Sequence, residues 1–158
     1  MRGDLRRRRV APGGIVVMRI HIGVLHATGN FSKLADDIKK QISGLVHETT
    51  EEVAAEYKQA VTTGVKTGRD YGEHKASAPG ESPADLTHEL VNSVSTNYPA
   101  EDRGEMKVGA GHGHTLEFGS KRIAARPTIR PIMEQKGPEF KRKCAKIIRD
   151  AAKAAEVK

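Results

Sequence analysis

The stretch that decides the fold is FSKLADDIKKQISGLVHETTEEVAAEYKQAV, residues 31–61. Its apolar residues recur at steps of three and four positions: Phe31, Leu34, Ile38, Ile42, Leu45, Val46, Val53, Tyr57 and Val61. This spacing puts one apolar stripe along a helix, so the sequence predicts a helix of about 30 residues. Asn30 or Ser32 can cap its start, and Gly64 is a stop signal at its end.

A strand is predicted just before this helix, because every second residue is apolar from Met18 to Val24. Residues 1–17 show no such pattern and carry five arginines against one acid. Like-charge runs of this kind usually stay disordered. We therefore expect a disordered basic tail over residues 1–17 and a single domain over residues 18–158, and we hypothesise that natural translation begins at Met18.

Regular patterning stops after the long helix. Residues 65–84 are rich in glycine and proline and have no amphipathic period, which predicts a long loop that is either functional or disordered. A short helix is predicted next, with Asp85 or Thr87 as its cap. Its apolar residues are Leu86, Leu90, Val91 and Val94.

The remainder of the chain predicts a small sheet and a last helix. Three β-like segments lie at residues 95–98, 105–108 and 114–118. The helix that follows has one apolar side and one basic side, the latter made of Lys141, Arg142, Lys143, Lys146, Arg149 and Lys153. The predicted fold class is α+β, with a small antiparallel sheet packed against a long N-terminal helix and a C-terminal helix.

The amino-acid composition limits the kinds of protein that this chain can be. The 158 residues include 27 Lys and Arg against 20 Asp and Glu, a net charge of +7. More than half of this excess falls within residues 1–17. No run approaches the roughly 20 apolar residues of a membrane span, and the single cysteine, Cys144, excludes an intramolecular disulfide framework. We expect a soluble intracellular product without a membrane partner.

The histidines do not make a recognisable metal site. His47-Glu48 and His88-Glu89 each begin a zinc-protease pattern, but neither has the second histidine one helical turn later. His112 and His114, with His74 and His88, could bind a metal only if the fold brought them together, and exposed histidines are favoured. No nucleophile elbow is present. We expect no enzymatic activity, metal or cofactor.

Two further features have competing interpretations. Gly109-x-Gly111-x-Gly113 suggests a phosphate loop, but a strand is expected after it, so a glycine-rich hairpin loop is favoured. The basic side of the last helix can neutralise nucleic-acid phosphates or can simply be a solvated helix face.

Two segments carry a family resemblance. One is ASAPGESPADLTHELVNSV at residues 76–94, and the other is LEFGSKRIAARPTIRP at residues 116–131. Together they resemble the tail-component (tail-completion, head–tail joining) family of long-tailed, siphovirus-like bacteriophages. In that family an Ala-Pro-Gly-Glu-Pro-Pro segment precedes Thr-Gly-x-Leu-x-x-Ser-Ile, and Glu-Phe-Gly-Thr precedes Ala-Arg-Pro-Phe-Leu-Arg-Pro. The matching residues are Pro79, Gly80, Thr87, Leu90, Ser93, Glu117, Phe118, Gly119, Arg126, Pro127, Arg130 and Pro131.

The chain departs from this pattern at three positions. His88 stands where the family has glycine, Ser120 where it has threonine, and Thr128 where it has an aromatic residue. The resemblance covers residues 18–155.

The resemblance implies a non-enzymatic virion protein of the tail or neck, assembled in the host cytoplasm. It implies a homo-oligomeric ring, hexameric by resemblance, that contacts neck and tail-tube proteins and touches channel DNA non-specifically. Residues 65–84 and 117–131 would dock on neighbours, with Arg126 and Arg130 held by the following prolines to bridge carboxylates. Alternatively, these prolines only end one element and begin the last helix.

A second function stays open on the residues alone. The chain could be a small basic module that binds nucleic acid non-specifically through Arg6 to Arg9 and the C-terminal helix.

Overall fold

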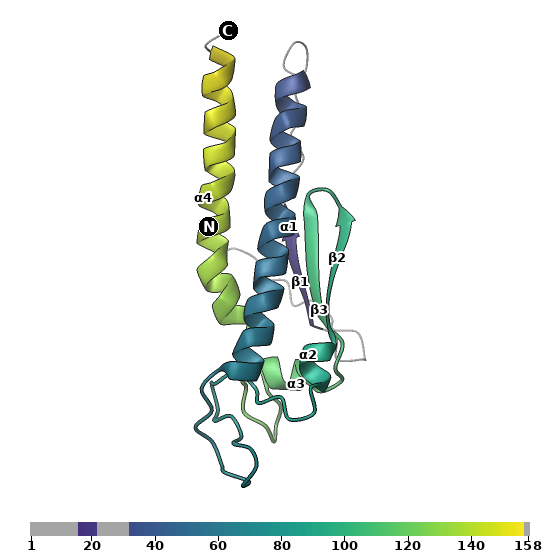
Figure 1. Cartoon of the computed structure of the whole chain (residues 1–158), viewed down its shortest axis with the longest axis vertical. Helices are drawn as coiled ribbons and strands as arrows, with labels where there is room; N and C mark the ends of the chain where they lie inside the picture. The colour runs from purple at the N-terminus through teal and green to yellow at the C-terminus, as the bar shows by residue number, and fades with distance from the viewer. Residues whose placement is uncertain (1–15, 22–31, 157–158) are drawn as a thin grey trace.

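The computed structural model describes residues 16–21 and 32–156. In chain order the elements are β1 (Val16–His21), α1 (Ser32–Thr63), α2 (Glu89–Asn92), β2 (Val94–Ala100), β3 (Arg103–Val108), α3 (Gly113–Phe118) and α4 (Ile129–Glu156). The predicted α+β class, with its long N-terminal helix, small sheet and C-terminal helix, is confirmed (Figure 1). β1 begins at Val16, so the expectation that the disordered tail extends to residue 17 is wrong for residues 16 and 17, which pair with β3. The expectations for residues 1–15 and for the strand beyond His21 lie outside the described residues.

The sheet has three antiparallel strands in the order β1-β3-β2. At its centre Met106 of β3 pairs with Met18 of β1 and with Thr96 of β2. The ladder between β2 and β3 shifts register between Asn97 and Ala100. The central strand, β3, comes last in sequence and pairs with β1. The sheet therefore connects residues near the start of the chain with residues 103–108.

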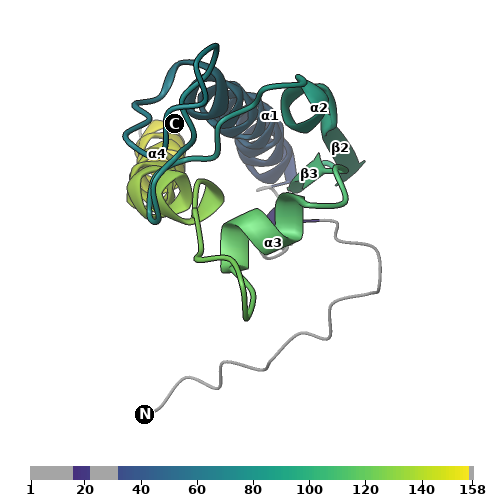
Figure 2. The same ribbon diagram turned by 90° about the horizontal axis from the view of Figure 1, so that it is seen from below.

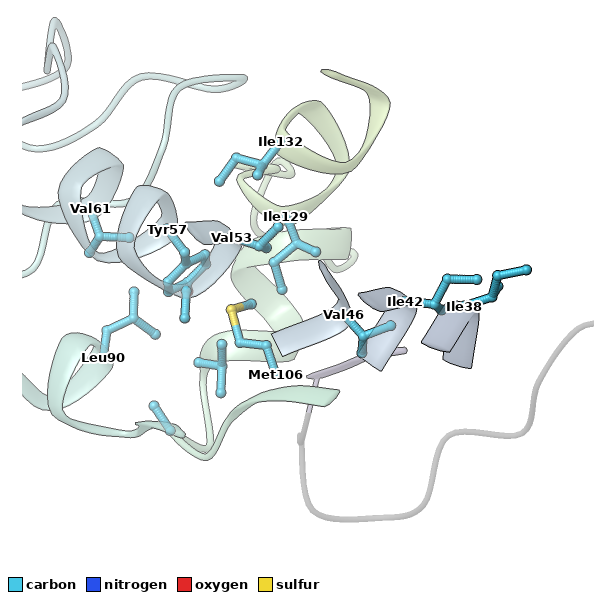
Figure 3. Close-up of a cluster of buried hydrophobic side chains, with 13 residues drawn as sticks. Ile38, Ile42, Val46, Val53, Tyr57, Val61, Leu90, Met106, Ile129 and Ile132 are labelled. Carbon is cyan, nitrogen blue, oxygen red and sulfur yellow. The ribbon is translucent and has the colours of Figure 1, made fainter. Parts of the chain in front are cut away.

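The long helix α1 is the centre of the molecule. It lies between the sheet on one side and α4 on the other (Figures 1 and 2). Most of the apolar stripe predicted for residues 31–61 is buried, as the periodicity requires, and Figure 3 shows Val46 and Val53 of this stripe near Met106 of the sheet and Ile129 of α4. The core therefore collects side chains from both sides of α1.

The end of α1 is fixed by close contacts. A Cβ on Gly64 would lie only 2.2 Å from the carbonyl oxygen of Ala60, so the path that the chain takes directly after Thr63, the last residue of α1, requires glycine. The Nζ of Lys66 then donates to that Ala60 carbonyl oxygen at 3.0 Å, which satisfies one of the free carbonyls at the helix end. The predicted stop at Gly64 is confirmed.

The predicted strand at residues 114–118 is wrong, because this segment is the short helix α3. Gly113 and Glu117, four residues apart, are its buried positions. A Cβ on Gly113 would lie 3.1 Å from Cγ1 of Val108, so the glycine lets α3 pack closely on β3. The glycine-rich stretch before α3 is consequently a strand-to-helix connection and no hairpin loop, and the N–H of Gly113 is already donated to Ala110.

The start of α2 also differs from the expectation. His88, with φ of 58°, precedes the helix in a left-handed conformation, and neither its side chain nor that of Thr87 caps it. Asp85 instead accepts a long hydrogen bond, 3.4 Å, from the N–H of Val91. Leu86 lies before the helix and is 60% exposed, whereas Leu90 is buried in the core.

Candidate interaction surface

Two loop segments far apart in sequence lie together at one end of the molecule. These are residues 64–88, which follow α1, and residues 119–128, which lead into α4 (Figure 2). The N–H of Gly80 donates to the carbonyl oxygen of Ala125 at 3.0 Å. The Arg126 guanidinium donates from Nε and Nη2 to the carbonyl oxygen of Ser77, at 3.3 and 3.2 Å. We call these two segments together the loop end.

Pro79 and Gly80 form the turn through which the first segment reaches the second. The N–H of Glu81 donates to the carbonyl oxygen of Ala78 at 3.1 Å, which closes a four-residue turn. Gly80 has φ of 87°, and proline followed by a positive-φ glycine is the preferred sequence of a type II turn. The Pro-Gly pair is therefore needed for backbone geometry.

Glu81 holds the base of this loop. Its carboxylate accepts hydrogen bonds from the hydroxyl and the N–H of Thr67 and from the N–H of Ala78, the last at 2.8 Å. These bonds, that of the Thr67 hydroxyl foremost, lower the pKa of Glu81 to about 2. Lys66 lies beside it and donates to the carbonyl oxygen of Ser82 at 2.8 Å, and burial lowers the Lys66 pKa. The Glu81 carboxylate thus holds together Thr67 and Ala78, which flank the intervening loop residues at their two ends.

Beyond this base, residues 68–76 form a short two-stranded arm. Across it the N–H of Gly68 donates to the carbonyl oxygen of Ala76, and the N–H of Ala76 donates to that of Arg69, at 2.9 Å each. At the tip, the rings of Tyr71 and His74 stack with their centroids 5.2 Å apart, and Gly72 turns the chain with φ of 87°. Tyr71 nevertheless stays 57% exposed, so the arm presents an ordered aromatic tip.

The carboxylate of Glu117 caps α4. Its Oε2 accepts from the N–H of Thr128 at 2.8 Å and from that of Ile129 at 3.2 Å, and its Oε1 accepts from the N–H of Arg130 at 3.1 Å. A negative charge at this position also complements the helix dipole. Glu117 is only 7% exposed, so within the described residues its oxygens serve the fold of this chain.

The two Arg-Pro pairs lie at the start of α4. Pro131 is in the first helical turn, where the missing N–H removes no intrahelical hydrogen bond. Arg130 and Pro131 are exposed, and Pro127 is half-buried. Arg126 was expected to bridge carboxylates, but the acceptors the structure gives it are carbonyl oxygens. A subunit contact for these residues stays a prediction.

Gly119 turns the chain back after α3. Its φ is 75°, and a Cβ would lie 2.9 Å from the backbone nitrogen of Ala125 and 3.0 Å from the carbonyl oxygen of Ile123. No other residue fits this close return without strain. The return leaves Phe118 and Ile123 exposed on the outside of the loop.

The structure separates the remaining sequence-predicted residues from the loop-end contacts. Leu90 is 1% exposed and belongs to the core. Ser93 donates from Oγ to the carbonyl oxygen of Leu90 at 2.8 Å, which closes the end of α2. Thr87 is exposed. The structure therefore joins Pro79, Gly80, Gly119 and Arg126 at one place, and leaves Leu90 and Ser93 in structural roles.

Sequence reasoning named Phe118 as a motif residue but missed the other exposed apolar side chains at this end of the molecule. Among the described residues, six large apolar side chains are exposed: four belong to the loop end, Val65, Tyr71, Leu86 and Ile123, and a fifth, Phe118, ends α3 directly before its second segment. The sixth, Ile148, is on α4. Scattered exposed apolar residues are ordinary, but a concentration at one end of a molecule indicates an interaction site. Exposure depends on tertiary packing, so no local signal in the sequence marks these positions.

Other kinds of site were sought over the same residues. Across residues 16–21 and 32–156, no three His, Cys, Asp or Glu side chains gather where they could hold a metal ion. None of the helices described has the length and apolar character needed to cross a membrane.

Comparison of the chain with protein-family models, with curated proteins and with solved structures finds no match.

Proposed function

We propose that this chain is a structural virion protein of a tailed bacteriophage that acts in tail completion or head–tail joining. It assembles as a ring, hexameric by resemblance, at the head-proximal end of the tail, where it contacts neck and tail-tube proteins. The loop end is the surface that docks on neighbours.

The observation that carries the proposal concerns backbone conformation at the motif positions. Among the described residues only four have a positive φ: Gly72, Gly80, His88 and Gly119. At three of these four positions, 80, 88 and 119, the family pattern has glycine. This chain keeps the glycine at 80 and 119 and has His88 at the other position. A left-handed backbone favours glycine for steric reasons. The backbone conformation of this chain at these positions therefore matches the family's glycines, whatever the similarity of the side chains.

The arrangement of the two motif segments gives further support. The segments that carry the resemblance are the same ones that the Gly80 to Ala125 and Arg126 to Ser77 hydrogen bonds join. The side chains of the motif residues Ser93, Glu117 and Arg126 make hydrogen bonds within the chain, whereas Tyr71 and Phe118 present exposed rings. The motif thus shapes the loop end, and the exposed apolar residues supply the contact.

Genetic complementation tests this proposal. Deletion of the gene is expected to leave filled heads and separate tails, seen by electron microscopy, and wild-type protein should restore joined, infectious particles. Tyr71→Ser with Phe118→Ser should fail to restore them, because each change removes an exposed apolar contact without touching the core. Ile148→Ser changes the exposed large apolar side chain of α4, which lies outside the loop end, and this control should restore them.

Normal particles from the deletion would overturn the proposed function. Restoration by the double variant as complete as that by Ile148→Ser would remove the loop end as the docking surface.

A further inference from the structure

Six of the eight basic residues of α4 form two sets with different surroundings, and Arg130 and Lys141, both exposed, belong to neither. Lys136 and Lys143 face the acidic side of α1 and are paired. Lys136 Nζ lies 3.0 Å from a carboxylate oxygen of Glu52 and 2.7 Å from one of Glu56. Lys143 Nζ lies 3.6 Å from Glu48 and 3.2 Å from Glu139 on its own helix. These two lysines fasten α4 to α1.

The second set is a stripe of four exposed residues: Arg142, Lys146, Arg149 and Lys153. At about 100° per residue, they fall within about 60° of arc on the helix surface. Their place on the helix lies roughly opposite the apolar side that packs on α1. Within the described part of the chain none of the four has an ion pair, and at about 100° per residue the acids Glu139 and Asp150 border them on one side. We call this set the α4 stripe.

We propose that the α4 stripe binds the phosphodiester backbone of duplex DNA. At about 1.5 Å of rise per residue, the stripe extends over about 16 Å, which equals the rise of about five phosphates along one strand. Its cations are therefore spaced to follow a strand without a sequence requirement.

The composition of the stripe favours nucleic acid over an acidic protein. A stable protein interface has a desolvated apolar centre, usually with aromatic anchors. The neighbours of the stripe on the outer side of α4 are the small residues Ala145 and Ala152. The nearest large apolar exposed side chain, Ile148, lies on a different side of the helix at 100° per residue. A surface of cations and alanines suits electrostatic binding of phosphates.

DNA binding by the α4 stripe does not depend on ring assembly. The stripe can therefore fail to bind DNA while the proposed function holds, and it can bind DNA if the proposed function is wrong. The experiment uses the full chain and a fluorescent 24-base-pair duplex of arbitrary sequence, with affinity followed by anisotropy between about 50 and 200 mM salt. The stripe variant changes Arg142, Lys146, Arg149 and Lys153 to Gln. The matched control changes four exposed lysines of α1, Lys33, Lys39, Lys40 and Lys58, to Gln and so has the same net charge.

The stripe variant should bind more than about tenfold more weakly than wild type at 100 mM salt. Its slope of log affinity against log salt should be smaller by about 3.6, because each of the four lost phosphate contacts removes roughly 0.9. The control should stay within about threefold of wild type. Arg142→Lys with Arg149→Lys preserves the charge and should bind as wild type, whereas all variants should keep the wild-type circular dichroism.

Three results would overturn the inference. One is equal loss of affinity in the stripe variant and the control, which would make binding a matter of net charge. Another is absence of wild-type binding at 50 mM salt. The third is competition by poly-glutamate as strong per charge as that by unlabelled duplex, which would assign the stripe to an acidic polypeptide.

Discussion

Glu117 accepts a hydrogen bond from the backbone N–H of Thr128 at 2.8 Å, and through it the end of α3 determines where α4 begins. The same carboxylate oxygen also accepts a hydrogen bond from the N–H of Ile129. A helix start is usually capped by the residue that precedes it. Here the Thr128 hydroxyl finds no partner among the described residues, and it cannot accept from Pro131, which has no N–H.

Loss of the Glu117 carboxylate should destabilise the fold. Glu117→Gln removes the charge and replaces one acceptor by a donor, which leaves buried N–H groups of α4 without a partner. The expected decrease in the free energy of unfolding is about 1–3 kcal/mol, measured by urea denaturation. Glu134→Gln, an exposed change on α4 itself, should shift it by less than about 0.5 kcal/mol. Equal effects would show that Glu117 does not cap the helix.

Thr128→Val should leave stability unchanged or increase it slightly. The Thr128 side chain is buried and its hydroxyl is unpaired in the described structure, so an apolar isostere removes a desolvation cost and no hydrogen bond. Thr50 is the natural comparison, because its buried hydroxyl donates to the Val46 carbonyl oxygen at 2.7 Å. Thr50→Val should lower the free energy of unfolding by about 1 kcal/mol. A larger loss from Thr128→Val would mean that its hydroxyl has a partner.

His88→Gly should stabilise the protein. His88 adopts φ of 58°, a conformation that costs a residue with a Cβ about 1–2 kcal/mol and costs glycine nothing. Glycine also loses more backbone entropy on folding, which offsets part of this gain. The expected net increase in the free energy of unfolding is about 0.5–1 kcal/mol. His88→Ala retains the Cβ and should give no gain. Thermal unfolding of both variants beside wild type, in one buffer, measures the two effects.

Two glycine-to-alanine changes should act in opposite directions. A Cβ on Gly104 of β3 would lie 2.0 Å from the Thr50 hydroxyl oxygen, so Gly104→Ala should cost about 1–3 kcal/mol through overpacking. Gly44 in α1 has open space where its Cβ would be. Gly44→Ala should therefore stabilise by about 0.5–1 kcal/mol, because alanine is the better helix former. Chemical denaturation of both variants gives the signs directly.

Stability should fall in acid partly because of Glu81. Its pKa is lowered to about 2 in the folded chain from an ordinary value of 4.5. A lowered carboxyl pKa stabilises the fold fully above about pH 4.5, and this stabilisation is lost as the pH falls through the folded value. Glu81→Gln should flatten the stability profile between about pH 4.5 and 2. Glu73→Gln, a change at the exposed arm tip, should leave the profile as in wild type.

The sequence predicted the parts of this fold that depend on repeated local patterns. The three- and four-residue spacing of α1 was sufficient to place a helix of 32 residues, because a long amphipathic period has no strand equivalent. The strand around Met106 also followed from its short apolar pattern. The Gly64 stop was marked by the residue type itself.

The sequence could not predict what tertiary contacts decide. Residues 114–118 are too few to separate a helix from a strand by periodicity. The helix is selected because Glu117 turns inward to the start of α4, a contact with residues 11 to 13 positions later in the chain. The motif residues of this end of the molecule were found, Phe118 among them, but Tyr71 was not, and the exposure of either ring could not be predicted, since exposure is a property of the assembled fold.

The position of β3 between β1 and β2 determines the order in which the sheet can form. β2 and β3 are neighbours in sequence and need only a tight turn to pair. β1, in contrast, pairs Val16 with Val108 and has no described partner in the sheet until β3 exists. Closure of so long a loop is entropically costly and slow. During synthesis on the ribosome, β1 must therefore wait until most of the chain has emerged, and a nascent chain truncated before β3 exposes an unpaired strand.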